Sequence, residues 1–135
     1  MPVSFTASNQ WLQKTASIPD RGALTVTCWA KFTGATGTFR AIWQLRDAGG
    51  THYTGLVQDS GADQFDLWRR HGGTIKKVGA FTPTSDTWYY LACTADFDAV
   101  DTVLDFYYAA EGATSLTNTG GSITGNANPF SSNSL

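Results

Sequence analysis

The chain has 135 residues, a length typical of one domain, and 41% of them are hydrophobic, which is enough for one packed core. A net charge of -2 with 15% charged residues argues against electrostatic binding of nucleic acid, which requires a basic face. The sequence contains no apolar run near the roughly 20 residues of a membrane span, and residues 1–5 lack the basic and apolar stretches of a signal peptide.

Short apolar or aromatic runs follow one another along the whole chain, separated by breaks rich in Gly, Asp or Thr, and no linker divides residues 1–135. This spacing predicts an all-β sandwich or barrel. The predicted strands are residues 4–7, 11–14, 24–32, 39–46, 53–58, 64–70, 74–81, 88–97 and 103–109.

A two-residue period is clearest in the strand at 24–32. One face carries Leu24, Val26, Cys28, Ala30 and Phe32, which places Trp29 on the opposite face, away from the core. The strand at 88–97 turns a similar set inward, namely Tyr89, Leu91, Cys93, Ala95 and Phe97. Cys28 and Cys93 are therefore expected to be buried free thiols, or a disulfide if their strands are neighbours in an oxidising compartment.

The segment at 103–109 fits two patterns. Helical spacing relates Val100, Val103, Leu104, Tyr107 and Tyr108, and Gly112 would end such a helix. The β-branched and aromatic residues favour a strand instead. Residues 112–135 carry no charged side chain, and we predict a loop-rich tail with one short strand near residues 122–124.

Four segments resemble motifs of the laminin G-like, concanavalin A-like jelly rolls. They are SFTASNQWL at 4–12, LTVTCWAK at 24–31, DTWYYLACTAD at 86–96 and VLDFYY at 103–108. They occur in the family's order, so the resemblance implies an antiparallel β-sandwich of jelly-roll type. Tyr89 and Tyr90 replace the usual histidines, and the family's closing strand is not recognisable after Phe130.

Glycosidases of this family carry a Glu-x-Asp-x-x-Glu motif, which supplies two catalytic carboxylates. Glu111 is the single Glu of the chain, so the motif is absent, and an Asp96–Asp98 pair is left as the remote alternative of an atypical glycoside hydrolase. The sequence also lacks a Gly-x-Ser-x-Gly elbow, and His52 and His71 lie beside turn residues. We therefore expect no enzymatic activity.

An acidic cluster of three residues suggests a cation. Asp96, Asp98 and Asp101 form Asp-x-Asp-x-x-Asp, and some relatives in the family bind calcium on loops at one rim of the sandwich. Oxygen ligands of this kind suit calcium, whereas the alternative is a solvated turn.

Aromatic residues exceed what a core of this size needs. Aromatic rings stack on sugar rings and anchor protein interfaces, so four of them are candidate contacts for a glycan or a partner: Trp29, Trp43, Trp68 and Tyr90. Arg69 and Arg70 add a basic cluster that would meet an acidic glycan or a partner's carboxylates, or would only solubilise the rim. In this family the concave sheet is the usual sugar platform.

These observations favour a non-catalytic structural or recognition module in a larger assembly, whose partners are other protein subunits. Such an assembly would be a virion or tail-associated particle, or an adhesion-type protein at an extracellular surface. The alternative is a carbohydrate-binding, lectin-like module. Because a bare strand edge is rare, we expect a neighbouring subunit, or a continuation of the chain, to cover the edge beside residues 4–7.

Overall fold

The computed structural model describes residues 23–31, 40–46, 53–59, 64–71, 74–96 and 103–119. This part of the chain contains strands and turns and no helix, and hence no helix that could cross a membrane. Its strands are β1 (Ala23–Lys31), β2 (Arg40–Arg46), β3 (Tyr53–Asp59), β4 (Gln64–His71), β5 (Thr74–Phe81), β6 (Trp88–Asp96), β7 (Val103–Ala110) and β8 (Thr117–Asn118).

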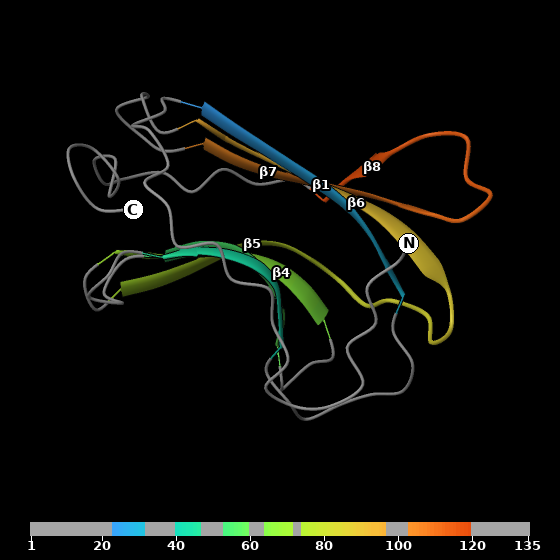
Figure 1. The fold of residues 1–135 in the computed structure, drawn as a ribbon, viewed down its shortest axis with the longest axis horizontal. Coiled ribbons are helices and arrows are strands. Elements are labelled where there is room, and N and C mark those ends of the chain that lie inside the picture. Colours follow the sequence, from blue (N-terminus) through green and yellow to red (C-terminus); the bar gives the residue numbers. More distant parts are fainter. Residues whose placement is uncertain are drawn as a thin grey trace.

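The strands form two four-stranded sheets that face each other (Figure 1). The strand orders are β1-β6-β7-β8 and β2-β3-β4-β5, and every pair of neighbours is antiparallel. The predicted antiparallel β-sandwich is therefore confirmed. The predicted strands at 4–7, 11–14 and 122–124 lie outside the described residues, as does the edge expected to need a cover.

The bounds of β1 to β7 agree with the predicted strands to within one residue at each end. Residues 103–110 form β7, so the helical alternative for this segment was wrong. Strand β8 was not predicted. It pairs Asn118 with Tyr107 and Thr117 with Tyr108, and Thr119 N donates to Phe106 O at 2.9 Å.

The hydrophobic core lies between the two sheets. Its fully buried side chains come from both of them and include Leu56, Phe65, Leu67, Leu91, Leu104 and Phe106. Phe81 of β5 stacks on Tyr108 of β7, with ring centroids 3.9 Å apart and an interplanar angle of 4°. Phe81 therefore ties one sheet to the other through an aromatic contact.

The two-residue periods predicted for β1 and β6 are confirmed. In β1 the side chains alternate between half-buried and exposed, and Leu24, Cys28 and Ala30 pack against the core. Four residues of β6 are buried in the same manner, namely Tyr89, Leu91, Cys93 and Ala95. The odd positions of β1 and the even positions of β6 consequently form the outer face of their sheet.

Strand β2 approaches β3 closely. The register between them shifts between Ala41 and Trp43, which marks a β-bulge. A Cβ at Gly55 would lie 2.5 Å from the carbonyl oxygen of Trp43, so only glycine fits this approach. The bulge turns Trp43 toward the core, where its side chain packs against the buried cluster.

Candidate functional site

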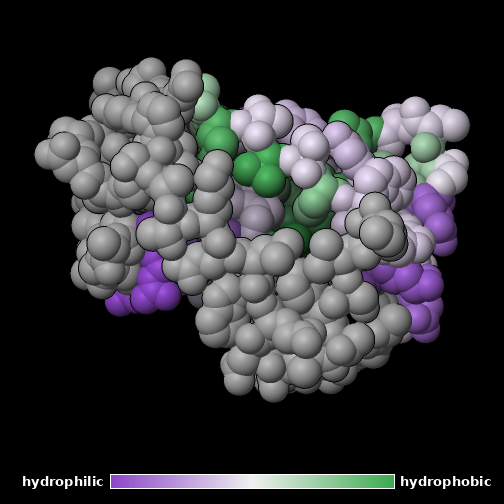
Figure 2. All heavy atoms as spheres, viewed as in Figure 1, coloured by the Kyte–Doolittle hydropathy of each residue, from purple (hydrophilic) through white to green (hydrophobic). Residues whose placement is uncertain are grey.

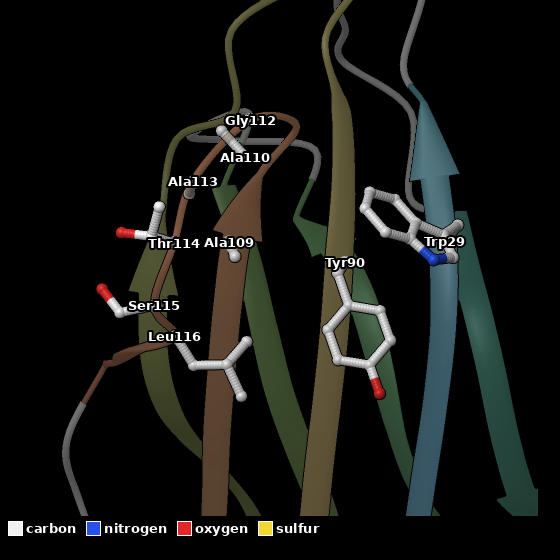
Figure 3. A pocket seen from close by; sticks show the side chains of 9 residues that line it. All are labelled: Trp29, Tyr90, Ala109, Ala110, Gly112, Ala113, Thr114, Ser115 and Leu116. Carbon is white, nitrogen blue, oxygen red and sulfur yellow. The ribbon is translucent and has the colours of Figure 1, made fainter.

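A hollow of about 320 Å³ lies on the outer face of the β1-β6-β7-β8 sheet. Figure 3 shows its lining, which comes from three strands and from the turn that connects β7 to β8. The lining residues are Trp29, Tyr90, Ala109, Ala110, Gly112, Ala113, Thr114, Ser115 and Leu116. The volume is at the lower end of the range for small-molecule sites.

Strand register places the floor of this hollow. Trp29 is the register partner of Tyr90, and Tyr90 is the partner of Ala109, so the three residues form one row across the outer face. Side chains in register on one face of an antiparallel sheet are neighbours. Because Ala109 is small, the space beside the Tyr90 ring is left open.

The β7–β8 turn forms the far wall of the hollow. Gly112 has a φ of 82°, a left-handed conformation that glycine adopts readily. Hydrogen bonds from Glu111 N to Trp88 O (2.8 Å) and from Ala113 N to Ala110 O (3.0 Å) fix the start of the turn. Leu116 lies farther along the turn, and its side chain extends toward Ala109 and Tyr90 in Figure 3.

The two aromatic rings give the hollow its shape. The centroids of Trp29 and Tyr90 are 5.5 Å apart and their planes meet at 60°. In Figure 3 the Tyr90 ring lies between Trp29 on one side and Leu116 on the other. Trp29 is 58% exposed and Leu116 is 49% exposed, although both are large and apolar. A flat ligand would therefore meet an aromatic surface with an apolar wall on either side.

None of the lining residues carries a charge. Their side-chain polar groups are the Tyr90 and Trp29 heteroatoms and the hydroxyls of Thr114 and Ser115, which point away from Tyr90 in Figure 3. Seen from the edge of the sandwich, the described residues at the top are mostly hydrophobic or weakly polar, and the strongly hydrophilic ones lie lower, at the left and right (Figure 2). The hollow is thus suited to a neutral ligand.

The predicted contact residues do not form one surface. Trp29 and Tyr90 come together in the hollow. Trp43 faces the core, where its Nε1 is buried. Trp68 and Arg70 lie on the other sheet, where they share the outer face of β4 because they are two residues apart.

The ring of Trp68 is already covered. Lys77 Nζ lies 4.4 Å from the centroid of that ring, forms an ion pair with Asp59, and lies 3.9 Å from Asp66 Oδ2. Trp68 Nε1 donates a hydrogen bond of 3.3 Å to the same Asp66 oxygen. Burial raises the pKa of the Asp66 carboxyl. The hydrogen bond from Trp68 and the positive charge of Lys77 lower it, but the net shift is upward. The charge of Lys77 is thereby neutralised within the chain.

Arg69 does not belong to a basic surface patch, contrary to the prediction. Its side chain is 2% exposed, and its register partner Thr54 is fully buried. The period of β4 turns Arg69 to the same face as Phe65 and Leu67, that is, toward the core. Burial also lowers the pKa of its guanidinium. A continuous Arg69–Arg70 site for an acidic glycan is therefore absent.

The comparison with protein families decides the relationship. A laminin G family model, described as the concanavalin A-like lectin/glucanases superfamily, matches residues 6–133. The chain belongs to this superfamily. The match extends beyond residue 108, where the last of the four sequence motifs ends. Searches of the curated proteins and of the solved structures gave no match. Membership in the lectin/glucanases superfamily supports a carbohydrate-binding or recognition module in general.

The calcium prediction, which some members of this superfamily suggested, stays a prediction. Asp96 is exposed at the end of β6, whereas Asp98 and Asp101 lie outside the described residues. Among the residues that the structure describes, no three His, Cys, Asp or Glu side chains are grouped so that they could hold a metal. Asp96 alone is not a cation site.

The two cysteines are free thiols, although their strands are neighbours as the disulfide alternative required. Cys93 is buried and pairs in register with Val26, so Cys28 is its diagonal neighbour on the inner face. Burial raises the pKa of Cys93 to about 12 and also raises the pKa of Cys28, which is half-buried. Both thiols are therefore protonated and unreactive at neutral pH.

Proposed function

We propose that this chain is a non-catalytic carbohydrate-recognition module that binds a glycan in the hollow beside Trp29 and Tyr90. The observation that carries the proposal is the placement of the Tyr90 ring between two large, exposed apolar side chains, Trp29 and Leu116. Aromatic rings stack on the C–H faces of sugars. A contiguous apolar surface of this kind marks a binding groove.

The position of the carboxylates supports a role without catalysis. Glycoside hydrolysis ordinarily requires an acid and a second carboxylate flanking the scissile bond. The lining of the hollow contains neither Asp nor Glu. On the other sheet, Asp59 and Asp66 share the ammonium group of Lys77, so both carboxylates already have a partner within the chain. We expect the purified chain to hydrolyse no aryl glycoside at a rate above that of buffer.

A glycan array with matched variants tests the proposal. Ala109→Phe fills the hollow with a ring on an outward-facing position, so it should abolish binding and leave the fold intact. Thr25→Phe is the control, because it adds the same ring to the same sheet face, four residues from Trp29 along β1. The proposal would be refuted if Ala109→Phe bound glycans as well as the wild type does, or if the wild type bound no glycan.

A second candidate is a structural component of a larger assembly, such as a virion or tail-associated particle or an adhesion-type surface protein. It is favoured by the exposure of three large apolar side chains, two on the β1-β6-β7-β8 sheet and one in its β7–β8 turn: Trp29 at 58%, Trp88 at 39% and Leu116 at 49%. Exposed apolar surface of this kind marks protein interfaces. Native mass spectrometry would favour this candidate if it showed a defined complex with other subunits that the variant Trp29→Ser no longer forms. The glycan array would then show no binding.

A further inference from the structure

We propose that the hollow selects a neutral pyranose that carries a methyl group, as a 6-deoxyhexose or an N-acetylhexosamine does, and that Leu116 and Ala109 receive this methyl. This inference rests on the proposed carbohydrate site and names the class of sugar that the site takes. Three features of the hollow support this inference: its lining carries no charge, one side is aromatic and the other aliphatic, and Leu116 lies over the aliphatic side.

The lack of charge excludes acidic sugars. A carboxylate or sulfate that enters the hollow loses water, and no lining residue offers it a cation. Lys31 pairs in register with Trp88, in the next row of the sheet, and is not part of the lining. A neutral sugar avoids this desolvation cost.

The two sides of the hollow differ in chemistry. Trp29 and Tyr90, with ring planes at 60°, offer aromatic surface for the C–H face of a pyranose ring. The opposite side is aliphatic, since Ala109 and Leu116 line it and the hydroxyls of Thr114 and Ser115 point away. A hydroxymethyl group placed there would lose hydrogen bonds to water without a new partner. A methyl group would gain apolar contact instead.

Leu116 is not part of the hydrophobic core. It is the one large apolar side chain in an exposed turn of small and polar residues, and it is 49% exposed. Its side chain extends over the sheet toward Ala109 rather than into the core between the sheets. Together with Trp29 and the Tyr90 ring, Leu116 forms a contiguous apolar surface, and surface of this kind marks ligand-binding grooves.

Two matched pairs of methyl glycosides measure the selectivity by calorimetric titration of the whole chain. L-rhamnose and L-mannose differ in the hydroxyl at C6, and N-acetylglucosamine and N-formylglucosamine differ in one methyl. We expect the methyl-bearing member of one pair to bind about fourfold more tightly, the effect of one buried methyl. A preference in the first pair identifies the methyl as that of a 6-deoxyhexose, and a preference in the second pair identifies it as that of an acetamido group.

Leu116→Ala should bring this ratio close to one, because it removes the aliphatic wall that receives the methyl. Ile75→Ala is the control, because Ile75 is an apolar side chain of the other sheet with 44% exposure, and it should keep the ratio. Equal binding within both pairs, or tighter binding of glucuronic acid, would overturn the selectivity while the carbohydrate site stands. Absence of binding to every sugar would overturn the proposed function as well.

Discussion

Replacing Trp29 with Ala separates a recognition role from a role in packing. Trp29 is 58% exposed, so about 100 Å² of its surface is withdrawn from water. At about 25 cal/mol per Å² this area contributes at most about 2.5 kcal/mol, and less with a compact unfolded chain. We therefore expect Trp29→Ala to lower the free energy of unfolding by about 1–2 kcal/mol. Phe81 is 9% exposed, and Phe81→Ala should cost about 3–5 kcal/mol.

Urea unfolding followed by circular dichroism gives both free energies, and sugar titration gives the affinities. Loss of an aromatic anchor at the centre of a contact costs about 2 kcal/mol, so Trp29→Ala should weaken sugar binding roughly thirtyfold. Phe81→Leu loses the stack on Tyr108 but keeps part of the buried volume, so it should lose less stability than Phe81→Ala and bind sugar like the wild type. If Trp29→Ala unfolded as readily as Phe81→Ala and bound sugar normally, Trp29 would be a packing residue and the reasoning would fail.

Three further measurements test other parts of the structure. Gly55→Ala should lower the free energy of unfolding by more than about 2 kcal/mol in urea titrations, because its Cβ would clash with the Trp43 backbone at 2.5 Å. Cys93, with a pKa of about 12, should not react with an aromatic disulfide reagent in the native chain at pH 8, and Cys28 should react slowly; both should react in urea. Burial raises the pKa of Asp66 above 3.8, so the native state holds this proton more tightly. The resulting stabilisation is complete below pH 3.8 and is lost as pH rises through the raised pKa, and Asp66→Asn should flatten that slope.

The sequence predicts the strands of this sandwich because one face of each is buried. A two-residue apolar period is then unavoidable, as in β1, where Trp29 alternates with Cys28 and Ala30. The same period applied to Phe65 and Leu67 would have turned Arg69 inward, but its charge argued for the surface. Trp43 escaped prediction because a bulge changes the face to which a side chain points, and no local pattern marks the bulge.

The candidate site was predictable only in part. The period of β1 and of β6 places Trp29 and Tyr90 on outer faces, but their pairing depends on register, which the partner strand sets. Strand β8 consists of Thr117 and Asn118, which form no apolar pattern. The sequence therefore did not predict β8, nor the position of Leu116 beside the sheet.

The β7–β8 turn is anchored at its two ends by the backbone. Ala113 N bonds to Ala110 O, and Thr119 N bonds to Phe106 O, so these bonds do not depend on side-chain identity. Residues 111–118 are exposed and contribute nothing to the buried core. Mutations at 114–116 can therefore accumulate with little effect on folding while they alter the wall of the hollow. Related chains with the same sandwich could in this way diverge in what they bind through three consecutive codons.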